Sequence, residues 1–315
     1  MGVINLSFRN SFGSQNRIAD SNILCASWLS GNSIMTNEVT VITGASSGIG
    51  AALAKHLGSK GHQLVLAARR EKELKEVAKQ GGTRALVVPT DVTRRADVGH
   101  LRSQELKEYG HVDVWVNNAG RGITRSVLDL TDQDVDDITS VVLKSVLYGM
   151  QAIIPHFQER GRGHLINVSS LLGRVPLVSH RSIYSAAKSG VNVLTANARM
   201  DLKGKYPGIH VSLVMPGMVE TDFYRVANTP QVPRAGSQVS PMIVQSAEEV
   251  AAQIVRLIEN PVAELYTNLA SADLVSRYYG NVGKFEENMA RRTPSSIALS
   301  QKADTSLHPG SGEEL

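Results

Sequence analysis

The spacing of apolar and polar positions changes at Val39. From there, short runs rich in β-branched residues alternate with stretches in which apolar residues recur every three or four positions. The first pattern predicts buried strands and the second predicts helices. We expect strands at 39–43, 64–68, 85–89, 112–117, 165–169, 209–215 and 263–267. We expect helices at 51–58, 71–79, 95–109, 134–157, 182–204 and 247–259.

This alternation predicts one α/β domain, which we place at residues 36–290. Strands that are nearly continuously apolar and separated by helices form parallel sheets covered on both faces. A chain of 315 residues is long enough to bury such a core. The pattern therefore predicts a mainly parallel seven-stranded sheet with helices on both faces.

The two ends of the chain lack this periodicity. Residues 1–35 are rich in Ser and Asn, carry Arg9 and Arg17, and have Asp20 as their one acid. That composition is typical of an organelle-targeting segment. The explanation that we favour is a disordered extension, or a start at Met35. Residues 291–315 collect Ser, Gly, Pro and charge, which predicts a disordered tail.

Composition excludes several function classes. The net charge is +4, but no run of five Lys or Arg occurs, so we expect no nucleic-acid partner. A single cysteine, Cys25, excludes an internal disulfide, and the nine His lack metal-ligand spacing. No apolar run approaches the length that spans a bilayer. We therefore expect a cytoplasmic protein with no metal and no membrane span.

A glycine-rich stretch at 43–50 (TGASSGIG) joins the first strand to the first helix. Glycines there let the backbone turn tightly and approach a pyrophosphate, which is bound by the free N–H groups of the helix N-terminus. The spacing is GxxxGxG and not GxGxxG, so its position after the first strand carries the argument. The expected cofactor-binding residues are Gly44, Ser46, Ser47, Gly48, Ile49 and Gly50.

Arg69 and Arg70 follow the second strand, where an NAD site would place an acid. A guanidinium suits the 2′-phosphate of NADP, which predicts NADP over NAD. The alternative is a solvated loop pair. Glu71 is expected in the first turn of the next helix. Asp91 and Val92 follow the third strand and could contact the adenine, although an acid near a helix N-terminus explains Asp91 as well.

Tyr184 and Lys188 are four residues apart and lie on one face of the predicted helix 182–204. An ammonium beside a phenol stabilises the phenolate, so the Tyr184 pKa should fall from about 10 towards neutrality. Such a group can donate and accept a proton near pH 7. Taken alone, the pair is also compatible with an ordinary amphipathic helix.

Five motifs in order resemble the single-domain branch of the short-chain dehydrogenase/reductase family. They are 43–50, 117–120 (NNAG), 167–170 (NVSS), the YxxxK pair of Tyr184 and Lys188, and 216–221 (PGMVET). The resemblance covers about residues 38–268. It implies a Rossmann-type, doubly wound fold and hydride transfer between a nicotinamide and a carbonyl/alcohol substrate. It also implies a homodimer or homotetramer, with an interface on the helix that carries Tyr184 and the helix near 247–259.

The same resemblance assigns roles to residues. Tyr184 would be the general acid, Lys188 would bind the nicotinamide ribose, and Ser170 would stabilise charge on the substrate oxygen. Thr221 would bind the nicotinamide carboxamide. The remaining cofactor contacts would come from Asn118, Ala119, Gly120, Pro216, Gly217 and Val219.

Two positions depart from the family pattern. Ser170 lies one residue farther from Tyr184 than usual, so we assign it as the catalytic serine with Ser169 as the second choice. Val142 stands where the family has an Asn that holds a water connecting the lysine to solvent. Proton resupply could be slower, or Val142 could simply pack in the core.

Residues 222–245 interrupt the helical pattern with Pro, Gly, Asn and Ser, which predicts a substrate lid. Its apolar members are Phe223, Tyr224, Val226 and Met242, which would line an apolar pocket or anchor the loop. The favoured function is thus an NADP(H)-dependent oxidoreductase acting on a small-molecule carbonyl or alcohol. The alternative is a dinucleotide-binding regulator or scaffold that has lost turnover.

Overall fold

The computed structural model describes residues 38–82, 85–223, 236, 238–239 and 242–292. The predictions for residues 1–35 lie outside this described part, and so does all but the first two residues of the predicted tail. Most of the predicted lid, including Tyr224 and Val226, lies outside it as well.

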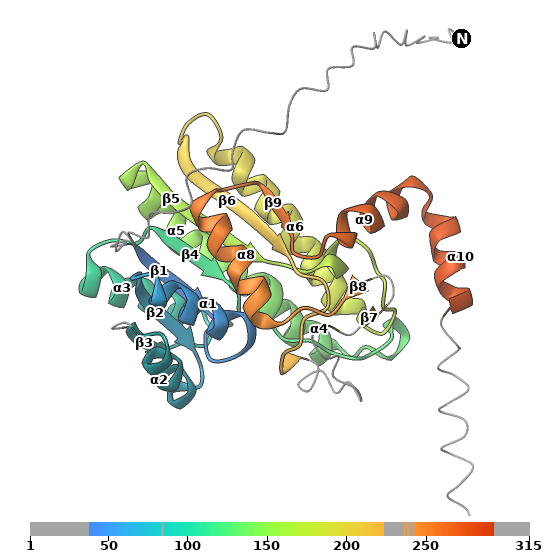
Figure 1. Cartoon of the computed structure of the whole chain (residues 1–315), viewed down its shortest axis with the longest axis horizontal. Helices are drawn as coiled ribbons and strands as arrows, with labels where there is room; N and C mark the ends of the chain where they lie inside the picture. The colour runs from blue at the N-terminus through green and yellow to red at the C-terminus, as the bar shows by residue number, and fades with distance from the viewer. Residues whose placement is uncertain (1–37, 83–84, 224–235, 237, 240–241, 293–315) are drawn as a thin grey trace, which may run out of the picture. The chain divides into compact units, whose positions relative to one another are not determined.

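Seven strands form one sheet in which every neighbouring pair is parallel. The spatial order is β3-β2-β1-β4-β5-β6-β9 (Figure 1). The order reverses between β1 and β4, the place where open α/β sheets bind ligands at the carboxyl ends of their strands. The strands are β1 (Val39–Thr43), β2 (Gln63–Ala68), β3 (Ala85–Pro89), β4 (Val114–Asn117), β5 (Arg162–Val168), β6 (Gly208–Met215) and β9 (Glu264–Tyr266).

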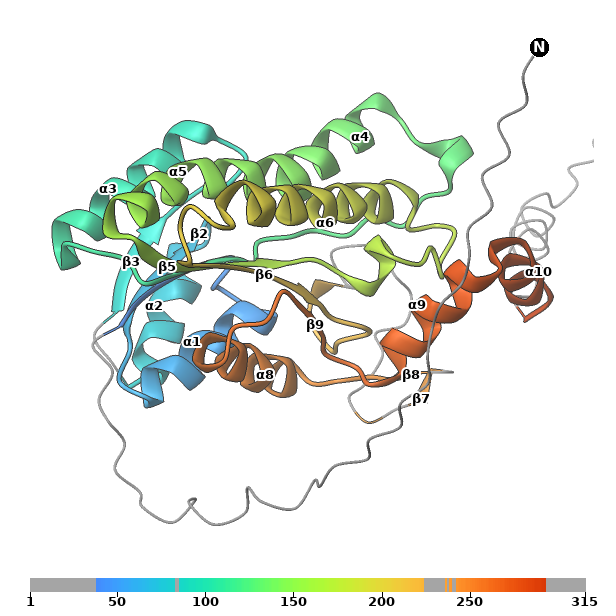
Figure 2. The ribbon, with the colours of Figure 1, turned by 90° about the horizontal axis from the view of Figure 1, so that it is seen from above.

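Helices cover both faces of this sheet, which confirms the predicted Rossmann-type architecture. Figure 2 shows α1, α2 and α8 on one face and α3, α5 and α6 on the other. Each face has its own apolar core, one centred on Leu53, Leu66 and Ile254 and the other on Trp115, Ile153 and Phe157. The helices are α1 (Gly48–Ser59), α2 (Glu71–Gln80), α3 (Arg95–Tyr109), α5 (Ser145–Arg160), α6 (Ser182–Leu202) and α8 (Ala247–Glu259).

The long helix predicted at 134–157 is three segments. It comprises α4 (Asp132–Ile138), a π-helical segment η2 (Thr139–Lys144) and α5. Together they span Asp132–Arg160, which is long and apolar enough to cross a membrane by length and composition. A core helix of a globular protein can have the same length and composition, so this segment does not contradict the expectation of no membrane span. Ile153 and Phe157 are fully buried against the sheet, so packing in the core explains the apolar composition of α5.

Two further helices follow the last strand and were not predicted. They are α9 (Ala270–Gly280) and α10 (Val282–Arg292), so ordered structure passes residue 290. Leu274 of α9 is 2% exposed and packs in one cluster with Leu171, Val275 and Phe285. Leu171 directly follows Ser170, so this helical pair supports one side of the predicted site. A two-stranded ribbon, β7 (Gln238–Val239) with β8 (Met242–Ile243), lies in the predicted lid.

Candidate active site

The glycine-rich turn leaves the carboxyl end of β1 and runs into α1. Gly44 has φ +68°, and a side chain there would bring its Cβ within 2.7 Å of Ala119 Cα. Glycine is therefore required both for the turn and for the contact with the neighbouring loop. No side chain caps the α1 N-terminus, and the first turn of α1 has no acid. Its N–H groups and helix dipole suit a phosphate.

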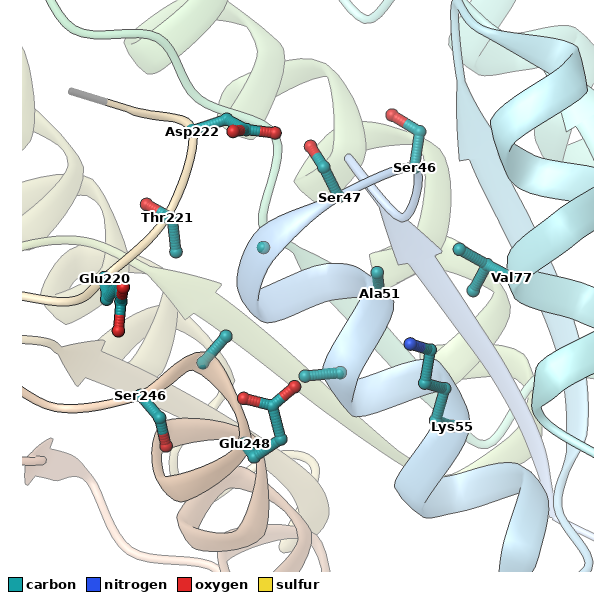
Figure 3. Close-up of a pocket in the computed structure, with 13 residues that line it drawn as sticks. Ser46, Ser47, Ala51, Lys55, Val77, Glu220, Thr221, Asp222, Ser246 and Glu248 are labelled. Atoms are coloured by element: carbon teal, nitrogen blue, oxygen red, sulfur yellow. The ribbon is translucent and has the colours of Figure 1, made fainter. Parts of the chain in front are cut away.

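A cavity of about 530 Å³ opens beside this turn. Ser46 and Ser47 lie on one side of it and Glu220, Thr221 and Asp222 on the other (Figure 3). Gly48 also lines the cavity. Gly48 and Thr221 lie close together, because a Cβ at Gly48 would be 3.2 Å from Thr221 Cγ2. The structure thus brings together the first and last of the predicted cofactor motifs.

Arg70 lies over the same turn. Its Nη2 donates to Ser46 Oγ and to Ser47 Oγ, each at 3.0 Å. The Arg70 side chain is half exposed, so its guanidinium can give up these two hydrogen bonds and bind a ligand instead. Glu71 is in the first turn of α2, as predicted, and pairs with Lys75. Of the two arginines after β2, Arg70 is therefore the one that contacts the glycine-rich turn.

Arg69 lies near Asp91 instead. Asp91 Oδ1 accepts hydrogen bonds from the backbone N–H and the hydroxyl of Thr93. Partial burial raises the pKa of Asp91, but these bonds and the charge of Arg69 outweigh it and bring the pKa below its ordinary value. Asp91 thus holds a local turn ahead of α3, which begins at Arg95, and its contact with an adenine stays a prediction. The adjacent Val92 is buried.

Asn118 connects the ends of β1 and β4 across the point where the strand order reverses. Its Nδ2 donates to the carbonyls of Thr43 and Gly44 at 3.0 and 3.3 Å. The Thr43 hydroxyl in turn accepts from the N–H groups of Asn118 and Ala119. Asn118 therefore braces the glycine-rich turn, and its contact with a cofactor stays a prediction.

The two serines after β5 differ in their bonding. Ser169 Oγ donates toward Asn192 Oδ1 at 2.5 Å and toward the Lys188 carbonyl at 3.2 Å, so α6 engages its hydroxyl. Ser170 Oγ accepts from the Leu172 N–H at 3.2 Å at the start of η3 (Leu171–Gly173). That bond uses only a lone pair, so the Ser170 hydroxyl proton can be donated to a ligand. The geometry favours Ser170 over Ser169.

Tyr184 and Lys188 lie in α6 as predicted and are both buried. Lys188 is 3% exposed, and its Nζ donates to the Val168 carbonyl at 2.8 Å and lies 5.8 Å from the centroid of the Tyr184 ring. Complete burial lowers the pKa of Lys188 to about 8. The same hydrogen bond fixes the lysine to the end of β5, two residues before Ser170.

Val142 packs against Tyr184. It is fully buried in a cluster with Ile138, Tyr184 and Ala187. It lies in η2, where the helix widens into π geometry, an irregularity that is frequent at functional sites. The position predicted from the family pattern is therefore beside the tyrosine, occupied by an apolar side chain.

A buried chain of polar side chains runs beneath the site and was not predicted. Trp115 Nε1 donates to Asn117 Oδ1, Asn117 Nδ2 donates to Asn167 Oδ1, and Asn167 Nδ2 donates to Thr195 Oγ1. These bonds tie β4, β5 and α6 together. The signal in the sequence was an Asn near the end of each of two apolar strands. A buried Asn side chain needs hydrogen-bond partners.

The 216–221 segment closes the site from the β6 side. The Pro216 carbonyl accepts from the Leu171 N–H at 2.9 Å, which joins this segment to η3. Val219 is buried and pairs with Gln245. Among the residues described, no group of His, Cys, Asp or Glu could hold a metal ion.

Residues 38–231 match the sequence profile of the short chain dehydrogenase family. This chain belongs to that family. It is similar to two curated proteins, each named an uncharacterized oxidoreductase. One from Staphylococcus epidermidis is 35% identical over 184 residues, which cover 58% of this chain and 79% of that protein. One from Staphylococcus aureus is 36% identical over 189 residues, covering 60% and 80%. The chain is thus an oxidoreductase of the short chain dehydrogenase family.

Three solved structures of this fold are similar, each with 25% sequence identity. A short chain dehydrogenase/reductase from Burkholderia phymatum in complex with NAD has a TM-score of 0.71 over 79% of this chain and 95% of that one. An alcohol dehydrogenase from Thermococcus sibiricus complexed with 5-hydroxy-NADP has a TM-score of 0.64 over 73% and 96%. A 3-ketoacyl-(acyl-carrier-protein) reductase from Brucella melitensis complexed with NADH has a TM-score of 0.66 over 74% and 98%. These neighbours bind both types of nicotinamide cofactor.

Proposed function

We propose that this protein is an NADP(H)-dependent oxidoreductase that transfers hydride between the nicotinamide and a carbonyl or alcohol substrate. The observation that carries the proposal is the bond from Lys188 Nζ to the Val168 carbonyl, which holds the Tyr184 helix turn against the strand end that leads to Ser170. The phosphate-binding turn at the neighbouring strand end supplies the other half of the site.

The residues of the site fit a dinucleotide. The uncapped α1 N-terminus and the serines of its turn would hold the pyrophosphate, and the 216–221 segment would face the nicotinamide end. When bound, the cofactor supplies or accepts the hydride. The protein's part is to hold the substrate carbonyl beside the nicotinamide and to donate or accept the proton.

Tyr184 is the proposed general acid. In reduction its hydroxyl gives its proton to the carbonyl oxygen as the carbonyl carbon receives the hydride, and the product is an alcohol. Ser170 donates a hydrogen bond to the same oxygen and stabilises the charge that develops there. Lys188 is cationic below about pH 8 and stabilises the tyrosinate that remains.

Arg70 supports NADP as the preferred cofactor. It stands at the end of β2, bonded to two serines of the phosphate turn, where a 2′-phosphate would replace weak neutral partners with a charged one. Arg69 is the second candidate for the contact with the 2′-phosphate, but the nearby Asp91 carboxylate already compensates part of its charge. NAD is the less favoured cofactor, because no acid of the β2 end binds this turn in the described part of the chain.

A direct assay tests the proposed reaction. The purified protein is mixed with NADPH and with a panel of aromatic ketones, aldehydes, diones and quinones, and the absorbance of reduced nicotinamide is followed. We expect oxidation of NADPH that depends on the carbonyl compound. Tight NADPH binding without turnover of any compound would support the regulator instead, the function that Val142 and the 7% exposure of Tyr184 favour.

Two further proposals concern assembly and location. We propose a homodimer or homotetramer, since Val193 and Met200 on the outer side of α6 are 60% and 64% exposed. Light scattering on the purified protein would test this, and a monomer at micromolar concentration would contradict it. A cytoplasmic location stays a prediction, to be tested by fractionation of the host cell.

A further inference from the structure

Phe223 lies directly against the tyrosine of the proposed site. The two rings meet edge to face, with centroids 5.2 Å apart and an interplanar angle of 60°. Phe223 is two residues beyond Thr221, and its N–H donates to Thr221 Oγ1 at 3.4 Å. The Phe223 ring therefore lies between the end of the 216–221 segment and α6, the helix that carries Tyr184. Tyr184 is only 7% exposed, so Phe223 is part of what covers it.

Arg181 holds the Phe223 ring from another side. Its guanidinium carbon is 5.4 Å from the ring centroid, and the side chain is 3% exposed. Its Nη1 donates to the Ile123 carbonyl at 3.0 Å. The quadrupole of an aromatic ring attracts a cation over its face, most strongly where the pair is removed from water. The arginine thus fixes the orientation of Phe223 relative to Tyr184, which is three residues farther along α6.

Gly122 makes room for this arrangement. A Cβ at this position would lie 2.6 Å from Phe223 Cζ and 2.8 Å from Arg181 Nη1. No such contact is tolerated, so any side chain at 122 would displace the aromatic ring, the guanidinium or both. The loop that carries Gly122 is held in place by the backbone bond from the Arg125 N–H to the His180 carbonyl at 2.7 Å.

The other apolar side chains packed in the cluster around Tyr184 are aliphatic. Ile123, Leu172 and Ile183 are partly buried against the cluster that contains Tyr184 and Val142. A carbonyl compound that reaches Tyr184 must therefore pack its substituents among apolar groups, with Phe223 as the one aromatic face that the described residues supply there. A slender substituent can lie along an aromatic face, whereas a branched one needs more room beside it.

We propose that Phe223 is the specificity-determining wall of the substrate site. With Arg181 and Gly122 as positioning residues, it selects apolar ketones and aldehydes whose carbonyl carries a slender substituent, and it excludes branched ones. This inference rests on the proposed oxidoreductase function.

The test compares two ketones that share an aromatic ring, acetophenone and pivalophenone, which differ by three methyl groups beside the carbonyl. The ratio of kcat/KM for pivalophenone to that for acetophenone is measured for wild type and for Phe223→Ala. Comparing this ratio between the two proteins cancels the difference in intrinsic reactivity between the ketones. We expect the variant to raise it about 10-fold or more, the range in which hydrophobic pockets discriminate between sizes.

Gly122→Ala provides an independent test without altering the aromatic residue. If its methyl group displaces Phe223, the ratio should change in the same direction as in Phe223→Ala. Phe223→Trp should lower it. Leu128→Ala is the matched control. The apolar side chain of Leu128, in the 3₁₀ helix Val127–Asp129, is 95% exposed, so its removal should leave the ratio unchanged.

Binding separates this proposal from the proposed function. Both ketones are also titrated calorimetrically into the protein saturated with NADP⁺, which requires no turnover. Selective gain of pivalophenone binding in Phe223→Ala supports the wall even if no reduction occurs, in which case only the proposed reaction fails. An equal change for both ketones, no change, or no binding of either ketone to any variant would overturn the assignment of Phe223.

Discussion

The Lys188 ammonium donates a 2.8 Å hydrogen bond to the carbonyl of Val168 from a site that is 3% exposed. One carbonyl oxygen is a weak partner for a buried cation, and burial accordingly lowers the pKa of Lys188 to about 8. The lysine is thus held in position for Tyr184 at a cost in stability, which has a definite pH dependence.

Below pH 8, Lys188 is charged in both the folded and the unfolded protein. Between pH 8 and its ordinary value of 10.5, only the unfolded chain keeps the proton, so stability rises with pH across that window. We expect the free energy of unfolding of wild type to rise relative to that of Lys188→Met by about 1.4 kcal/mol per pH unit. Denaturant titrations from pH 7 to 10 would measure it. If the difference in unfolding free energy between the two proteins did not change with pH, burial would not lower the pKa of Lys188.

Replacing Arg70 by Ala should weaken NADPH binding about 10-fold or more, because one charge-assisted contact to the 2′-phosphate is lost. Binding of NADH should be nearly unchanged. Arg69→Ala is the matched control and should have the smaller effect on NADPH. Equal weakening of both cofactors would contradict the 2′-phosphate contact, and a larger effect of Arg69→Ala would transfer the contact to Arg69.

Val142→Asn should reveal whether proton resupply limits turnover. The amide enters a fully buried apolar cluster beside Tyr184, so we expect a loss of stability of about 1–3 kcal/mol. We also expect a smaller solvent deuterium isotope effect on kcat than in wild type, because the amide can order a water near the tyrosine. Val142→Thr controls for polarity without an amide. Identical isotope effects in all three proteins would show that Val142 only packs.

Glu105 in α3 is fully buried, and neither carboxylate oxygen has a hydrogen-bond partner among the described residues. Burial raises the pKa of Glu105 to about 9, although the charge of Arg102 partly opposes the shift. The folded protein therefore keeps the proton that the unfolded chain releases above about pH 4.5, and stability falls as pH rises from there to 9.

Glu105→Gln removes this titration. We expect the variant to gain stability relative to wild type as pH rises from 5 to 8, by a few kcal/mol at most. Thermal or denaturant unfolding at the two pH values would measure the gain. The prediction fails if the stability difference between the two proteins is the same at both.

The sequence predicted the sheet because its strands are nearly continuous apolar runs, and it predicted the site where motifs follow strand ends. The sequence did not show whether Arg69 or Arg70 contacts the glycine-rich turn. Adjacent residues at a strand end point in different directions, and only the fold shows that Arg70 reaches Ser46. The contact between Arg181 and Phe223 joins segments 42 residues apart with no shared motif. Helices α9 and α10 were missed because their buried face is narrow, and Leu274 is the one large apolar side chain of the pair that is nearly fully buried.

The most direct measurement of the central claim is the single-turnover reduction of a carbonyl substrate by Tyr184→Phe, together with its NADPH dissociation constant. The account predicts an unchanged dissociation constant and a chemical step slowed by about 100-fold or more, because the proton donor is lost while the cofactor site remains. A wild-type rate of reduction by Tyr184→Phe would contradict it.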